Sequence, residues 1–259
     1  MRDTATFLGQ AGVRLVLNGV IIYVDPYLTD AVGDKYGAHL RRRVSPPIEP
    51  ARVTDADWVL ITHEHEDHAD PATLRPIAEA VPSATFMCPE PALRVLRSAG
   101  IDDGRAKTAT EVWTPVGRDV SVRAVPAAHP TVERDEAGRL KSVGYLIRCP
   151  GRLIFHAGDT MPHEELFQAV LSEGSPDWAF LPVNERNYFK DAAGIVGNMS
   201  IREAFQTAER LHIRHVVPTH WDLFQANGVL PEEIELVYQD MHPSFALHLT
   251  RAGETEDLT

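Results

Sequence analysis

Three histidines and one aspartate lie within six consecutive positions of this 259-residue chain, between positions 63 and 68. Uncharged imidazole and carboxylate are ligands that zinc, manganese and iron accept in proteins. In an extended segment alternate side chains leave on one face, so His63, His65 and Asp67 can point together. A turn just after them can bring His68 alongside. The spacing predicts a metal site rather than a polar loop that is merely rich in histidine.

Short apolar runs precede these candidate ligands and predict the strands that position them. The histidine-rich stretch follows the run 58–61, which has the length and branching of a buried strand. Loops at strand ends carry chemistry in folds that alternate strands with helices. Three further residues follow similar runs: His129 after 121–126, Asp159 after 152–156 and His220 after 215–218. A lone histidine in such a place is ordinarily a surface residue, but beside the first motif His129 becomes a candidate ligand.

The rest of the chain predicts further strands and helices. A hairpin turned at Asn18-Gly19 joins the β-like runs 7–17 and 20–24, and a capping box at Ser200 begins a helix with one apolar stripe. Residues 28–51 have no clear period and are expected to form a long loop. Other strands are expected at 84–88, 143–149, 178–183 and 245–249, and other helices at 71–80, 92–98, after Pro162 and at 231–239.

In chain order, the pattern H-x-H-x-D-H followed by His129, Asp159 and His220 resembles the ligand set of the metallo-β-lactamase superfamily of hydrolases. The resemblance implies an α/β fold of the αββα type, a four-layer sandwich of two mixed sheets with helices outside and the metal site at one sheet edge. Nothing in the chain looks like a linker, so we expect one such domain over residues 1–259. The resemblance implies two divalent ions, and the ligand types suit manganese or zinc, with iron as a third option. The first ion would be held by His63, His65 and His129, the second by Asp67, His68 and His220, with Asp159 bridging them.

The same resemblance implies hydrolysis by a metal-bound hydroxide, since two cations can lower the pKa of a shared water and polarise the oxygen that gains charge. Asp67 and His156 are the candidate catalytic residues, with Asp67 accepting the proton. Asp25 and Asp222 would support the ligands from behind, and for His156 and Asp222 a polar place in the core is the alternative. Zinc β-lactamases place a cysteine ligand where this chain has none, and di-iron relatives carry glutamate where His65 stands. Neither β-lactam hydrolysis nor oxygen chemistry is therefore expected.

A narrower resemblance extends along nearly the whole chain. Seven segments are similar to the L-ascorbate-6-phosphate lactonase branch: 7–12, 24–28, 125–127, 156–160, 181–188, 197–200 and 218–221. This branch opens a sugar-derived lactone phosphate with the help of divalent metal, often Mn(II). The resemblance implies a lactonase for a phosphorylated or acidic sugar lactone. Its substrate contacts would be Arg186, Asn187, Lys190 and Asn198, and Arg186 and Lys190 could neutralise a phosphate or simply be surface charges.

Two other functions stay open. A phosphodiesterase could use the same dinuclear site, and a metal-binding sensor or partner protein could have lost catalysis. Retention of every expected ligand speaks against the second alternative. The basic triplet Arg41-Arg42-Arg43 could attract an anionic substrate, although a solvated face is its more ordinary use.

Composition limits the partners. The chain has 25 Lys and Arg against 37 Asp and Glu, a formal net charge of -12, which disfavours a sequence-independent grip on nucleic acid or an anionic membrane. Cys88 and Cys149 lack metal or redox spacing and are expected to be buried thiols, which suits a reducing compartment. No stretch approaches the roughly 18 apolar residues of a membrane span, and the first residues lack a signal core. The sequence predicts a cytoplasmic enzyme for a small anionic substrate, with no nucleic-acid or membrane partner and a homo-oligomer as one option.

Overall fold

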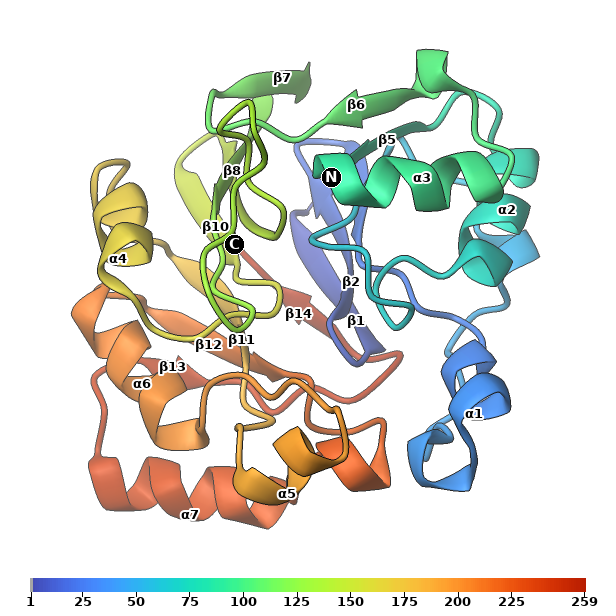
Figure 1. The fold of residues 1–259 in the computed structure, drawn as a ribbon. Coiled ribbons are helices and arrows are strands. Elements are labelled where there is room, and N and C mark those ends of the chain that lie inside the picture. The colour runs from blue at the N-terminus through green and yellow to red at the C-terminus, as the bar shows by residue number, and fades with distance from the viewer. Residues whose placement is uncertain (1) are drawn as a thin grey trace.

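Two seven-stranded β-sheets lie face to face in the computed structural model, which describes residues 2–259 (Figure 1). The N-terminal sheet contains β1 (Thr4–Gly9), β2 (Gly12–Leu17), β3 (Val20–Val24), β4 (Trp58–Leu60), β5 (Thr85–Cys88), β6 (Ala106–Thr108) and β14 (Thr255–Asp257), in the order β14-β1-β2-β3-β4-β5-β6. The C-terminal sheet contains β7 (Thr114–Gly117), β8 (Val120–Pro126), β9 (Val143–Cys149), β10 (Arg152–His156), β11 (Trp178–Pro182), β12 (His215–Thr219) and β13 (Ala246–Leu247), in the order β13-β12-β11-β10-β9-β8-β7.

Helices cover the outer face of each sheet. The helices are α1 (Ala31–Tyr36), α2 (Pro71–Ala80), α3 (Glu90–Ser98), α4 (Glu164–Leu171), α5 (Tyr188–Ala192), α6 (Ile201–Arg210) and α7 (Pro231–Met241). Figure 1 shows α2 and α3 outside the N-terminal sheet and α4, α6 and α7 outside the C-terminal sheet. Both sheets mix parallel and antiparallel pairs. This arrangement confirms the predicted αββα sandwich.

Strand alternation explains the layers, because successive side chains of a strand leave on opposite faces. In β9, Tyr145 and Ile147 belong to the core between the two sheets, whereas Leu146 belongs to the core beneath α4 and α6. A third core, which includes Val59 and Leu74, fills the space between the N-terminal sheet and its helices. Burial on both faces is why the strands are apolar almost throughout.

Two of the predicted helices, α2 and α6, begin where the sequence places them, whereas α3 begins at Glu90, two residues before the predicted start. Asp70 accepts a hydrogen bond from the backbone N–H of Ala72 and Pro71 opens α2. Ser200 and Glu203 form the predicted capping box of α6, and Ile201, Ala204, Phe205 and Ala208 are its buried apolar stripe. Cys88 and Cys149 are buried free thiols, as predicted.

Three expectations about the elements need correction, and the C-terminal strand was not predicted. The run 7–17 is two strands, β1 and β2, separated by a tight turn at Gln10 and Ala11 rather than one. Residues 28–51 are not without structure, since they hold α1 and a 3-10 turn at Ala38–Leu40. The predicted strand 245–249 keeps only the two residues of β13. The C-terminal strand β14, which pairs with β1, had no alternating apolar pattern to predict it.

Parallel pairing brings the predicted ligands to one edge of the sandwich. β3 and β4 pair in parallel, as do β10, β11 and β12. β8 and β10 both pair antiparallel with β9, so they also run in the same direction. The two sheets meet at this edge, where the hydroxyl of Tyr145 in β9 donates to the carbonyl of Ile61 after β4 at 2.8 Å. The loops after β3, β4, β8, β10 and β12 therefore emerge close together.

Among residues 2–259, no helix is long and apolar enough to span a bilayer.

Candidate metal centre

The seven residues predicted as metal ligands lie in three overlapping groups at this shared edge. Within each group the ligand atoms lie within 4.8 Å of one another. The first, here called the three-histidine group, is His63, His65 and His129; the second, here called the aspartate group, is Asp67, His68 and His220; the third is His63, His68 and Asp159. The third group shares one histidine with each of the others, so the two main groups are contiguous.

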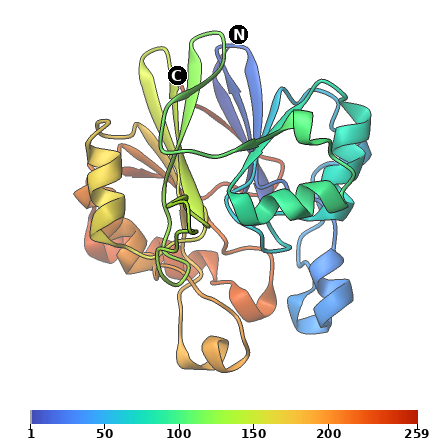
Figure 2. The same cartoon turned by 45° about the horizontal axis from the view of Figure 1, so that its top comes forward.

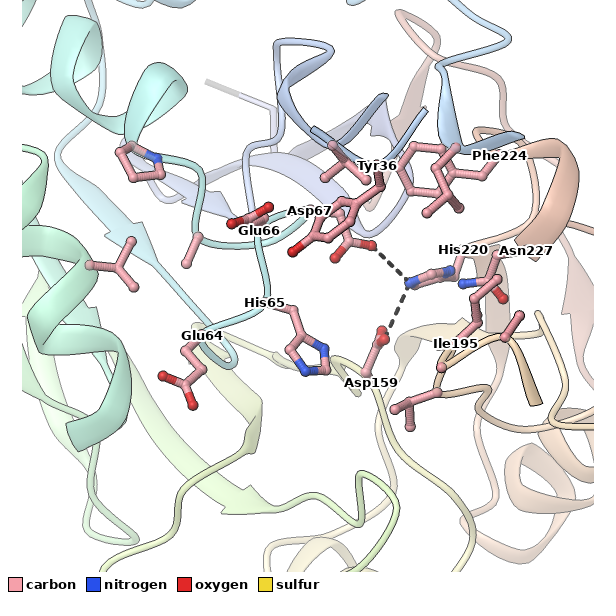
Figure 3. Close-up of a pocket in the computed structure, with 18 of the residues that line it drawn as sticks. Tyr36, Glu64, His65, Glu66, Asp67, Asp159, Ile195, His220, Phe224 and Asn227 are labelled. Atoms are coloured by element: carbon pink, nitrogen blue, oxygen red, sulfur yellow. Dashed lines mark ion pairs between the residues drawn. The ribbon is translucent and has the colours of Figure 1, made fainter. Parts of the chain in front are cut away.

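Asp159 lies between the two main groups (Figure 3). Its Oδ2 lies 3.2 Å from Nε2 of His220 and 3.8 Å from Nε2 of His129, and its Oδ1 lies 3.4 Å from Nε2 of His68. The preceding Gly158 makes this placement feasible: its φ is +60°, and a Cβ there would lie 2.8 Å from the carbonyl oxygen of Val143. One carboxylate thus faces histidines of both groups, as a bridging ligand must.

Several of these ligand atoms are buried without a hydrogen-bond partner. Among residues 2–259, Nε2 of His63, Nε2 of His68 and Oδ1 of Asp159 have none, although buried polar atoms are nearly always paired. Divalent cations would satisfy all three atoms, and this mixture of imidazole nitrogen and carboxylate oxygen suits zinc, manganese and iron. The side chains present therefore fit the pair of cations that the ligand pattern implies.

Asp25, predicted to support the ligands, lies directly behind His68. Its carboxylate accepts hydrogen bonds from the backbone N–H of Thr62 at 2.8 Å and from the Thr62 hydroxyl at 2.6 Å, and it lies 2.7 Å from Nδ1 of His68. A proton held on Nδ1 leaves Nε2 free to face a cation. Asp25 and His220 also have positive φ values, 43° and 63°, a conformation that costs side-chain-bearing residues about 1–3 kcal/mol and that clusters at functional sites.

Asn198 lies in a different place from the one predicted. Its side chain is fully buried, its Oδ1 lies 3.1 Å from Nδ1 of His129, and its Nδ2 donates to Asn184 at 3.0 Å. It therefore stands behind His129 as Asp25 stands behind His68. Sequence reasoning placed Asn198 against the substrate because nothing local shows which side of the ligand an asparagine occupies.

Four other predicted site residues are not brought to the pocket. His156 is buried, with Nε2 2.8 Å from the carbonyl oxygen of Ala11. Arg186 pairs with Glu203 at 3.0 Å, and the Lys190 ammonium donates to the main-chain carbonyls of residues 184 and 185. Asn187 caps α5. These positions match the core-polar and structural alternatives rather than catalysis or phosphate binding.

Asp222, predicted to support the ligands, reaches the same centre through the β1–β2 turn. Its Oδ1 accepts a hydrogen bond from the backbone N–H of Gln10 at 3.0 Å, and burial raises the pKa of its carboxyl group. Gln10 itself contacts two candidate ligands and was missed. The signal available was its position in the segment 7–12, where the chain resembles lactonases, but the surrounding apolar residues concealed the turn.

The two main groups differ in protonation when no cation is bound. Burial alone would lower the pKa of both His220 and His68, but nearby carboxylates, led by Asp159, outweigh it. The pKa of His220 rises to about 9, and that of His68 rises well above its usual value. Burial prevails at two members of the three-histidine group: the pKa of His129 falls to about 4 and that of His63 falls well below its usual value.

Metal binding is therefore expected to release protons. At pH 7 a cation must displace those on His68 and His220, since a metal binds the neutral imidazole nitrogen, and we expect about one to two protons per loaded chain. Apparent affinity should rise as the pH rises through about 9, where His220 loses its proton. Protonated His220 and its neighbouring carboxylates also stabilise the folded, cation-free protein. This contribution is complete below pH 6.5, the ordinary pKa of histidine, and is lost as the pH rises through about 9. The free energy of unfolding of the cation-free protein should therefore fall between these pH values. Calorimetry of Mn(II) binding in buffers of different ionisation enthalpy measures the released protons, and binding without release would contradict the assignment.

The metal centre lies at the base of a pocket of about 770 Å³. Figure 3 shows His65, Asp67, Asp159 and His220 facing it. Apolar side chains form much of its wall: Val32, Tyr36, Leu40, Ile195, Val196 and Phe224. Figure 2 shows α1 and α5 projecting beyond the sheets. Residues of α1 and of the segment after α5 line the pocket.

Residues 24–221 match the Beta-lactamase superfamily domain, and the chain belongs to this family. It is 28% identical over 255 residues to a UPF0173 metal-dependent hydrolase of Rubrobacter xylanophilus, covering 96% of this chain and 94% of the relative. It is 26% identical to a probable L-ascorbate-6-phosphate lactonase of Escherichia fergusonii and 25% identical to N-acyl-phosphatidylethanolamine-hydrolyzing phospholipase D 1 of Caenorhabditis elegans. These matches cover 74% and 85% of this chain but only 56% and 64% of the relatives.

Solved structures share the fold. A possible metal-dependent hydrolase from Veillonella parvula superposes with a TM-score of 0.78 at 17% identity, covering 99% of this chain and 100% of that one. Isothiocyanate hydrolase from Delia radicum gut bacteria gives a TM-score of 0.77 at 20% identity and covers 98% of both chains. The αββα sandwich is thus shared, with strongly diverged sequences.

Proposed function

We propose that the protein is a metal-dependent hydrolase and, more narrowly, a lactonase. The observation that carries the proposal is the position of Asp159 between two groups of ligand atoms, several of them buried and unpartnered. The metal-dependent hydrolases that match nearly the whole chain support the general class. The lactonase match supports the narrower one.

Two divalent cations at such a centre supply a Lewis acid for the carbonyl oxygen and lower the pKa of an attacking water. The side chains of the protein would hold the cations in place and accept the proton that the water loses. His68 and His220 each lie within 3.8 Å of the carboxylates of both Asp67 and Asp159. Asp25 and Asn198 fix the orientation of the rings of His68 and His129. Asp67 faces the pocket, and its neighbouring histidines outweigh the effect of burial and lower its pKa, so its carboxylate is ionised at neutral pH in the cation-free protein. We propose that this carboxylate accepts the proton of the attacking water once bound cations have displaced the protons of those histidines.

The side chains of the pocket wall determine which substituents of the substrate can bind. Arg94, the one Arg or Lys among the described lining residues, pairs with Glu64, and Arg186 and Lys190 are engaged elsewhere. Arg41 pairs with Asp30 and Asp34. Among the described residues that line the pocket, a phosphate would therefore meet one cationic side chain, Arg94, which is already paired, whereas an apolar substituent would meet apolar side chains. We accordingly propose a lactone whose ring ester reaches the metal centre and whose remainder is uncharged.

A substrate panel tests the proposal. Protein loaded with Mn(II) or Zn(II) is offered neutral γ- and δ-lactones of increasing alkyl length, an acidic sugar lactone and bis-p-nitrophenyl phosphate. We expect the neutral lactones to be opened, with kcat/KM rising with chain length, and the activity to vanish with EDTA and return with metal. Cleavage of the phosphodiester alone would contradict the lactonase and favour the second candidate, a phosphodiesterase, which the phospholipase match supports.

A further inference from the structure

Gln10, at the turn between β1 and β2, reaches into the aspartate group. Its Nε2 donates to Oδ2 of Asp67 at 2.6 Å and lies 3.0 Å from Nε2 of His220. The residue is 1% exposed. Its terminal amide therefore contacts two of the three candidate ligands of this group, at the Asp67–His220 pair marked in Figure 3.

The backbone is built to hold this side chain in place. Gln10 has a φ of 59°, a conformation that costs a residue with a side chain about 1–3 kcal/mol and that surrounding contacts must enforce. Its N–H donates to Asp222 at 3.0 Å, and its carbonyl accepts from the N–H of His220 at 2.7 Å. Glycine would adopt this turn at no such cost, so the turn alone does not require a glutamine.

The other atom of the amide has no partner. Among the described residues, Oε1 of Gln10 is buried and accepts no hydrogen bond, a state that costs about 1–3 kcal/mol for a neutral polar group. A half-turn of a terminal amide exchanges its oxygen and nitrogen. An amide oxygen is a hard donor that suits manganese better than it suits metals that prefer sulfur or imidazole.

We propose that Gln10 is a further residue of the second cation site. Without a cation, the side-chain N–H of Gln10 links the carboxylate of Asp67 to the ring of His220. When a cation is bound, the side-chain oxygen of Gln10 would either coordinate it or orient Asp67 and His220 as its ligands. The aspartate group then offers more oxygen donors than the three-histidine group, which biases it toward Mn(II) over Zn(II). This inference rests on the proposed pair of cations but not on the lactone.

The experiment measures metal binding by the full chain and needs no substrate. Cation-free wild type, Gln10→Leu and Gln10→Glu are titrated with Mn(II) and with Zn(II) by calorimetry, and bound metal is counted after gel filtration. Gln168→Leu, which changes an exposed glutamine of α4, is the matched control. Circular dichroism and thermal melting confirm that each variant is folded.

We expect Gln10→Leu to weaken the second Mn(II) by about 10- to 100-fold, the usual cost of losing a group that orients metal ligands, and to leave the first ion unchanged. Gln10→Glu should retain two ions and bind the second Mn(II) at least as tightly as wild type, because it restores an oxygen donor. Two Mn(II) ions bound by Gln10→Leu with wild-type affinity would overturn the role of Gln10 alone. If Gln10→Leu does not fold, weaker binding of the second Mn(II) by Gln10→Glu overturns it. Failure of the wild type to bind any cation would instead overturn the metal centre itself.

Discussion

Asp159→Asn should leave a folded protein that has lost bound metal and at least about 100-fold in kcat/KM. The carboxylate lies within 3.8 Å of His68, His129 and His220, so a neutral amide there removes charge from both ligand groups. Loss of a group that only orients a metal ligand already lowers metal affinity or activity by about 10- to 100-fold. Loss of a ligand shared by both cations should lower them further. Metal counting together with steady-state kinetics on the neutral lactones measures both effects.

Asp240→Asn is the matched control for this variant. It makes the same chemical change in a carboxylate that pairs with Arg202 on the exposed surface of α7, where a substitution typically changes stability by less than about 0.5 kcal/mol. Metal content and rate should equal those of the wild type. An Asp159→Asn protein with unchanged metal and unchanged rate would show that Asp159 does not bridge the groups.

Asp25→Ala should produce the largest loss of stability. The fully buried carboxylate accepts two hydrogen bonds from Thr62 and contacts Nδ1 of His68. Nearby carboxylates, Asp25 among them, raise the pKa of His68, so truncation leaves a buried charge with less compensation. Removing one partner of a buried ion pair costs about 3–5 kcal/mol, and urea denaturation of the cation-free protein should show a fall of this size in the free energy of unfolding.

Asp103→Ala provides the comparison, because it breaks an exposed pair with Arg97 and should change the free energy of unfolding by less than about 1 kcal/mol. An Asp25→Ala protein no less stable than this control would refute the support assigned to Asp25. Its metal affinity should also fall, since His68 would no longer be held with Nε2 toward the centre.

The gathering of the ligands was predictable because it depends on two regular features of the chain. Side chains alternate along an extended segment, which relates His63, His65 and Asp67 locally. Parallel strands end at one edge of a sheet, which relates residues as distant as Asp159 and His220. The αββα sandwich was implied by the resemblance to the metallo-β-lactamase superfamily, which the order of the ligands carries.

The surroundings of the ligands were less predictable, because tertiary contacts alone decide which way a polar side chain faces. Arg186 suggests a phosphate contact in sequence, but Glu203, 17 residues later, engages it. The sequence position of Asn198 is compatible with a place next to the substrate and with a place behind His129, and the structure shows the second. Gln10 was hidden inside an apolar run, since a tight turn made by two residues of positive φ, Gly9 and Gln10, leaves no period in the sequence.

Anomalous diffraction from crystals soaked with Mn(II) can show whether the protein holds two cations side by side with Asp159 between them. We expect two manganese peaks per chain, one at the three-histidine group and one at the aspartate group, each in contact with the Asp159 carboxylate. Fully occupied crystals with no peak there, or with peaks only elsewhere on the molecule, would contradict this arrangement.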